Sequence, residues 1–195
     1  RPDDLGAFVL KTVLERTQLD PALVEEVYLG CANQAGEDNR NVARMALLLA
    51  GMPVEVGGVT FNRLCASGLT AVNMAARAIR AGEGDIFLAG GVESMSRAPY
   101  SLPKADTAYG SSNLTAWNTA LGWRYPNPMM EELYGTEPMG ETAENLAEMY
   151  SISRQEQDAF ALQSHQRAIA AIDTGRFAEE IIPVPIPQRK GDPIM

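Results

Sequence analysis

The sequence has 195 residues, of which 46% are hydrophobic and 21% are charged, so it can bury the core of one or two globular domains. Its formal net charge of −9 at pH 7 argues against a nucleic-acid partner, because phosphate backbones are bound by basic surfaces. No apolar run approaches the length of a membrane span. Two cysteines at unlike positions suggest no disulfide framework, which is typical of a reducing compartment. The composition therefore predicts a globular cytoplasmic protein with no membrane partner.

Helix and strand patterns alternate over the first 97 residues. Apolar residues at helical spacing predict a first helix that ends near Arg16. The elements expected after it are a strand at 26–29, a helix at 42–50, a strand at 58–61, a helix at 67–80 and a strand at 85–89. The last strand is apolar on both faces, as the interior of a sheet requires. Such alternation predicts a layered α/β domain.

The pattern changes after Arg97. Residues 99–138 hold many Pro, Gly, Ser, Asn and aromatic residues without a sustained period. A loop of this length is usually functional or disordered, and its tryptophans and tyrosines favour a packed, functional loop. Two helices are expected at 140–149 and 154–172.

Capping signals support the second of these helices. Ser153 and Glu156 have the spacing of a capping box, and Gly175 is expected to end the helix. Three prolines at alternate positions then predict an edge or extended strand; they are Pro183, Pro185 and Pro187.

One cysteine lies where the strand at 58–61 is followed by the helix at 67–80. At this junction Cys65 would sit beside first-turn N–H groups that have no partner within the helix. These groups and the helix dipole favour a thiolate, and the same N–H groups could donate to an oxyanion. From position alone, however, a buried core cysteine is the commoner outcome.

Several ordered motifs favour catalysis over the core-cysteine alternative. They are Asn62-x-x-Cys65-x-Ser67-Gly68, Gly90-Gly91-Val92-Glu93-Ser94-Met95-Ser96, Met139-Gly140-Glu141-Thr142-Ala143-Glu144-Asn145, Gln155-x-Gln157-Asp158-x-Phe160-Ala161 and Gly175-Arg176-Phe177. Through these motifs essentially the whole chain resembles the thiolase family. The resemblance implies a thiolase-like layered α/β/α domain with an incomplete sheet at 1–97, and an inserted, mostly helical and irregular loop domain at 98–195. The C-terminal thiolase domain is expected to be absent.

The resemblance also implies acyl transfer through a thioester on Cys65, which divides one difficult step into two easier ones. The expected activity is acetyl-CoA C-acetyltransferase, which forms or cleaves 3-ketoacyl-CoA. CoA thioesters are then substrates, and no cofactor or metal is expected. Met139 matches a thiolase methionine that lines the acyl and pantetheine pocket, although a methionine in this position is more often plain packing.

Two other function classes stay open. A ketosynthase-like condensing enzyme shares the fold and the cysteine nucleophile, but the motif that begins at Met139 and the long loop domain speak against it. A non-catalytic acyl-CoA-binding or assembly module is the third possibility. The resemblance further implies a homodimer or homotetramer, in which the edge strand at 58–61 pairs with its copy.

The histidine, asparagine and second-cysteine motifs of thiolases do not occur in these residues. We expect His165 on a solvated helix, Cys31 as loop or core filler and Glu93 as a structural anchor of its own turn. Four cationic side chains could bind the phosphates of CoA, although a solvated surface position is the default expectation for each. They are Lys104, Arg124, Arg189 and Lys190. The chain therefore looks like the N-terminal half of a thiolase subunit, and we expect it to be inactive alone.

Overall fold

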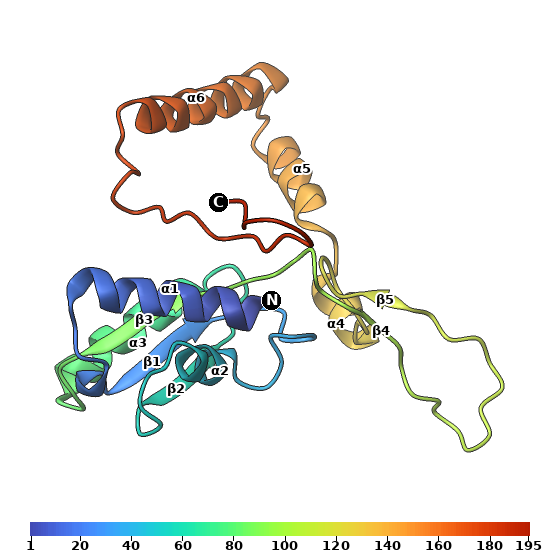
Figure 1. Ribbon diagram of the computed structural model, residues 1–195. Helices are drawn as coiled ribbons and strands as arrows, with labels where there is room; N and C mark the ends of the chain where they lie inside the picture. The colour runs from blue at the N-terminus through green and yellow to red at the C-terminus, as the bar shows by residue number, and fades with distance from the viewer. The chain divides into compact units, whose positions relative to one another are not determined.

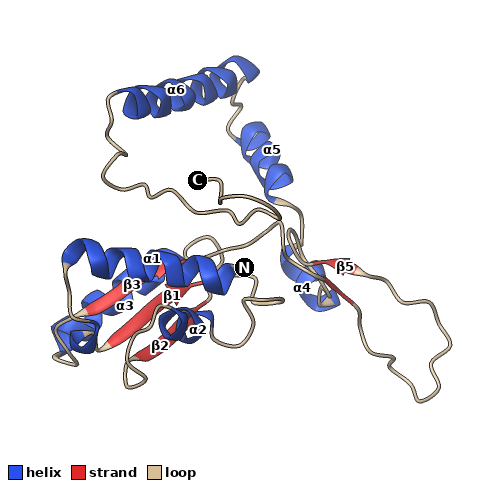
Figure 2. Ribbon diagram, in the orientation of Figure 1, coloured by secondary structure: helices blue, strands red, loops and turns tan.

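The computed structural model describes residues 1–195, which form two compact units, Arg1–Thr136 and Glu137–Met195. Figure 1 and Figure 2 show the helices and strands of each unit. The domain border expected near residue 97 was inferred from the family resemblance. The division into compact units does not test it, so it stays a prediction. None of the helices has the length and the apolar character that crossing a bilayer requires.

The first unit contains a parallel three-stranded sheet in the order β2-β1-β3. Its main elements are α1 (Pro2–Thr17), a 3-10 turn (Pro21–Leu23), β1 (Glu26–Gly30), α2 (Val42–Leu49), β2 (Gly57–Phe61), α3 (Ser67–Ala81) and β3 (Phe87–Gly91). Because β1 pairs in parallel with both neighbours, the carboxyl ends of all three strands lie at one edge of the sheet. In open α/β sheets this edge is where ligands bind.

Helices cover both faces of the sheet, as the alternation of side chains on β1 shows. Val27 and Leu29 belong to a core cluster with side chains of α1 and α2, whereas Tyr28 packs with Ala71 and Ala75 of α3. Figure 1 shows α1 and α2 on one side of the sheet and α3 on the other. Val27 is fully buried, and burial of such a side chain stabilises the fold by about 1.5–3 kcal/mol. The layered α/β/α prediction is therefore confirmed.

Two details of this unit differ from the sequence-based expectation. The third strand was expected at 85–89, but β3 covers Phe87–Gly91 because its register places Gly90 and Gly91 opposite Leu29 and Gly30. Leu69 and Ile79, two of the apolar residues at helical spacing in α3, are exposed. Alanines face the sheet instead, since the helix lies close to glycine-rich strand ends.

Residues 98–136 form an irregular extension of the first unit. Two short antiparallel strands, β4 (Tyr100–Ser101) and β5 (Trp117–Asn118), pair with one another, and α4 covers Pro128–Tyr134. Thr119 is buried, and it is the only buried residue after Val92.

The second unit contains α5 (Met139–Met149) and α6 (Arg154–Asp173). The expected capping box of Ser153 and Glu156 is present, and Gly175 has a positive φ of 73° after the helix. The strand expected around the three prolines is wrong: only an isolated bridge joins Ile186 to Ile194. The prolines lack the N–H groups that a continuous ladder needs.

Candidate active site

The loop between β2 and α3 carries Cys65 at the carboxyl edge of the sheet. Cys65 is exposed and lies two residues before α3 begins at Ser67. Leu64, immediately before it, has a left-handed backbone with φ of 49°. Non-glycine residues rarely adopt this conformation unless their surroundings enforce it, so neighbouring contacts must hold the loop.

Two polar side chains fix the Cys65 loop. The buried hydroxyl of Ser67 accepts a hydrogen bond from Arg63 N (2.8 Å) and donates one to Leu64 O (2.6 Å). Asn62 Oδ1 accepts a hydrogen bond from Leu64 N (3.0 Å). The motif Asn62-x-x-Cys65-x-Ser67 therefore clamps the backbone on both sides of the thiol. Sequence reasoning noted this motif only as a resemblance and missed what its polar residues do.

The first turn of α3 leaves backbone donors free near Cys65. The N–H groups of Ala66 and Ser67 are bonded to Arg63 O and Leu64 O. The N–H groups of Gly68 and Leu69 have no hydrogen-bond partner. The predicted supply of unpaired helix donors is therefore present, although it begins at Gly68. Such donors can stabilise negative charge that develops beside them.

Glycines allow α3 to approach the strand ends. A Cβ on Gly30 would lie 2.3 Å from Ser67 C and 2.4 Å from Gly68 N, both backbone atoms. A Cβ on Gly91 would lie 3.1 Å from the carbonyl oxygen of Gly30. Only glycine at position 30 is compatible with this packing, which brings the Cys65 loop onto the end of β1.

The loop after β1 is bonded to the Cys65 loop and to the loop after β3. Asn62 Nδ2 donates to Ala32 O (2.9 Å). The carboxylate of Glu93 accepts from Ala32 N (2.8 Å) and Asn33 N (3.1 Å). Glu93 thus has the predicted structural role, but it anchors the loop after β1 and not its own turn. Both of its oxygens are engaged, which disfavours its use as a general base.

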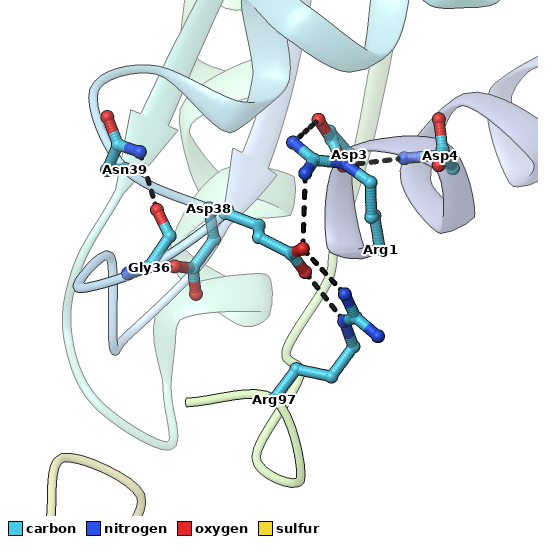
Figure 3. Close-up of polar contacts among 8 residues, drawn as sticks. Arg1, Asp3, Asp4, Gly36, Asp38, Asn39 and Arg97 are labelled. Atoms are coloured by element: carbon cyan, nitrogen blue, oxygen red, sulfur yellow. Dashed lines mark hydrogen bonds and ion pairs between the residues drawn. The ribbon is translucent and has the colours of Figure 1, made fainter. Parts of the chain in front are cut away.

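Ion pairs of Glu37 join the loop after β1 to neighbouring segments (Figure 3). Arg97 forms a bidentate pair with Glu37, with both N···O distances at 2.6 Å. Arg1 bonds the same carboxylate at 3.1 Å and Asp3 at 2.8 Å. The hydrogen bond from Arg97 lowers the pKa of Glu37, and the one from Arg1 lowers the pKa of Asp3. Both carboxylates are thus held ionised at neutral pH.

Cys31 is the buried counterpart of Cys65. It packs with Val42 and Val92, and its thiol donates to Asp38 Oδ2 at 3.6 Å. Burial, followed by the nearby charge of Glu93, raises the pKa of Cys31 to about 12. The prediction that Cys31 is a loop or core filler is therefore confirmed, because its side chain is buried among apolar neighbours.

The ligand atoms of Cys31, Asp38 and Glu93 lie within 4.8 Å of one another, a grouping that sequence reasoning missed. Asp38 accepts hydrogen bonds from Gly36 N and from the thiol, and Glu93 accepts from two backbone N–H groups. Through these hydrogen bonds all three side chains hold the loop after β1 in place.

The remaining site predictions fall in the second unit. Met139 is the first residue of α5 and is 79% exposed, and its role in an acyl pocket stays a prediction. His165 lies on α6 and is exposed, as expected for a solvated helix residue.

The comparisons with known proteins agree with this arrangement. The family model "Thiolase, N-terminal domain" matches residues 1–195. The chain belongs to the thiolase family. A β-ketoadipyl-CoA thiolase of Pseudomonas aeruginosa is 58% identical over all of this chain and 49% of its own length. An acetyl-CoA acetyltransferase of Chromobacterium violaceum is 48% identical over 98% of this chain and 47% of its own.

A solved thiolase structure confirms the fold. The crystal structure of the Bacillus anthracis acetyl-CoA acetyltransferase has a TM-score of 0.85 and 38% sequence identity, and covers 98% of this chain and 47% of that one. The chain thus spans about half the length of the thiolases it matches.

Proposed function

We propose that this chain supplies the nucleophile of a thiolase that cleaves or forms 3-ketoacyl-CoA, and that Cys65 is this nucleophile. The exposed Cys65 thiol on a clamped turn that leads into the free N–H groups of Gly68 and Leu69 at the start of α3 carries the proposal. Of the two cysteines, only Cys65 is accessible to a thioester.

In the cleavage direction, the Cys65 thiolate attacks the C3 carbonyl carbon of the substrate. The C2–C3 bond breaks, and its electron pair leaves with C2, which takes up a proton to give acetyl-CoA. The acyl group on the sulfur then passes to the thiol of a second CoA, whose proton goes to a base. The Cys65 thiol makes no hydrogen bond with an acid or base of this chain, so another group must handle these protons.

The substrate proposal starts from the relatives. β-Ketoadipyl-CoA, a 3-ketoacyl-CoA whose chain ends in a carboxylate, is the substrate we favour, because the relative of that name is 58% identical. The expected acetyl-CoA C-acetyltransferase activity is the second candidate, supported by the relative at 48% identity. Comparing kcat/KM for thiolysis of 3-oxoadipyl-CoA and acetoacetyl-CoA by a complete thiolase subunit carrying these residues separates the two.

The role of Cys65 is tested by mass spectrometry of the same subunit after incubation with acetyl-CoA. We expect an acetyl group on Cys65, loss of turnover in Cys65→Ala, and retained acylation in the matched control Cys31→Ala. Near-normal thiolysis by Cys65→Ala would overturn the proposal. Binding of acetyl-CoA without an adduct would instead favour a non-catalytic acyl-CoA-binding module.

We also propose a symmetric dimer, or a dimer of two dimers, formed through β2. This strand lies at an edge of the sheet, where self-pairing would remove exposed backbone groups. Light scattering of the complete subunit at micromolar concentration should therefore give at least twice the monomer mass, and a monomer would contradict the proposal. The cytoplasmic location stays a prediction.

A further inference from the structure

Arg124 is held at the carboxyl edge of the sheet by neutral oxygen atoms. Its Nη1 donates to Thr119 O (3.1 Å), and its Nη2 donates to Asn33 O (3.3 Å) and Asn33 Oδ1 (3.0 Å). The side chain is half-buried. A guanidinium has five N–H donors, so these three bonds leave at least two of them available.

The charge of Arg124 is not matched by a carboxylate. Arg97 and Arg1 at the same edge are ion-paired with Glu37, so their charges are already compensated within the chain. Glu93 bonds the backbone N–H of Asn33 but forms no ion pair with Arg124. A guanidinium that bonds only neutral oxygens keeps its full charge and spare donors, so this one has the capacity to bind an anion from outside the chain.

Arg44 also binds neutral oxygens, but it lies at the opposite edge of the sheet. Arg44 donates to the carbonyl oxygens of Val54 and Val56, which precede the start of β2 at Gly57. Cys65 follows the end of the same strand. Arg124 is thus a half-buried cation with spare donors that is bonded to the loop after β1.

Short polar links join Arg124 to the Cys65 loop. Arg124 bonds Asn33; its neighbour Ala32 accepts a hydrogen bond from Asn62 (2.9 Å), which lies three residues before Cys65. Thr119, whose carbonyl oxygen accepts a hydrogen bond from Arg124, is also held in place. Its side chain is buried, and its N–H (3.2 Å) and its hydroxyl (2.6 Å) both donate to Pro99 O. The guanidinium is therefore positioned before any ligand binds, which raises affinity.

We propose that Arg124 binds the terminal carboxylate of a dicarboxylic 3-ketoacyl-CoA and so selects acyl chains that end in a carboxylate over neutral chains of equal length. The inference rests on the proposed thiolase function and on β-ketoadipyl-CoA as its substrate class. Arginine suits this role because its guanidinium stays charged and its remaining N–H groups can donate to a carboxylate oxygen. The default expectation of a solvated surface residue is incorrect for Arg124, since it is half-buried and bonded to Asn33.

The test compares two six-carbon substrates, 3-oxoadipyl-CoA and the neutral 3-oxohexanoyl-CoA, in a complete thiolase subunit carrying these residues. Arg124→Gln should lower kcat/KM for 3-oxoadipyl-CoA by about 10- to 100-fold, the size expected for a hydrogen bond to a charged group, mainly by raising KM. Its kcat/KM for 3-oxohexanoyl-CoA should stay within about threefold of the unchanged enzyme. Arg124→Lys should keep part of the preference, because it retains the charge without the bonds that hold the guanidinium in place.

The matched control is Arg80→Gln, which removes an exposed arginine from the last turn of α3 and should change neither substrate. Equal losses for both substrates in Arg124→Gln would mean that Arg124 only supports the Asn33 loop, and unchanged kinetics would place the carboxylate elsewhere. Either result overturns the inference while leaving the proposed function intact. An unchanged enzyme that cleaves only the neutral substrate would refute the proposed substrate class, and the inference with it.

Discussion

The close contact between Gly30 and the start of α3 predicts that Gly30→Ala disables the nucleophile. The new Cβ would lie 2.3 Å from Ser67 C and 2.4 Å from Gly68 N, whereas real Cβ contacts are essentially never shorter than 3.0 Å. Backbone atoms cannot swing aside as a flexible side chain does, so the helix start must move. Overpacking of this kind costs about 1–3 kcal/mol, and a shift of about 1 Å in a reacting group costs about 100-fold in rate.

Gly90→Ala is the matched control, because it adds the same methyl group to the neighbouring strand. Its Cβ would meet only Leu29 Cδ2, at an ordinary contact distance of 3.6 Å. Both variants should be compared in the complete subunit by urea unfolding and by the rate of Cys65 acetylation. Gly30→Ala should lower the unfolding midpoint and slow acetylation, and Gly90→Ala should do neither. Equal behaviour of the two variants would refute the close packing of α3 on β1.

Three further predictions concern the thiols, the ion pairs and the isolated chain. Iodoacetamide at pH 8 should alkylate Cys65 well before Cys31, as read by peptide mass spectrometry, because Cys31 is buried with a pKa raised to about 12; equal rates would contradict this. The hydrogen bond from Arg97 lowers the pKa of Glu37, so this ion pair stabilises the folded protein when Glu37 is ionised. The stabilisation is fully present above the unfolded-state pKa of about 4.3 and disappears as the pH falls through the folded-state pKa. The stability difference between the unchanged protein and Glu37→Gln should therefore be seen by urea unfolding at pH 7 and disappear in acid, once Glu37 is protonated in the folded state; a difference that persists when Glu37 is protonated would place its origin outside this ion pair. The purified 195-residue chain should show no thiolysis of acetoacetyl-CoA, and turnover comparable to a complete subunit would refute our assignment of the proton-transfer groups.

Local sequence patterns predicted the helices and strands of the first 97 residues to within about two positions, because periodicity and glycine positions are local signals. The same signals do not show which face of a helix meets the sheet. Ala71 and Ala75 face it, although Leu69 and Ile79 form the more obvious apolar pattern. That choice depends on how close the strand ends allow the helix to come, which is a property of the assembled fold.

The polar framework of the site was harder to predict for a related reason. Glu93 bonds residues 60 and 61 positions away, and Arg124 bonds Asn33 across 91 positions. A carboxylate or a guanidinium looks the same in sequence whether it is solvated or bonded to a distant loop. Position and resemblance indicated Cys65, while the groups that hold its surroundings became visible only with the loops in place.

The irregular extension at residues 98–136 has a consequence for engineering. It contributes one buried residue, Thr119, and Arg124 bonds it to the loop after β1. The hydrophobic core and the turn that carries Cys65 are built from the residues before it. Residues 98–136 should therefore be exchangeable between thiolases as a cassette, so that acyl-chain preference can be recombined with an unchanged Cys65 loop.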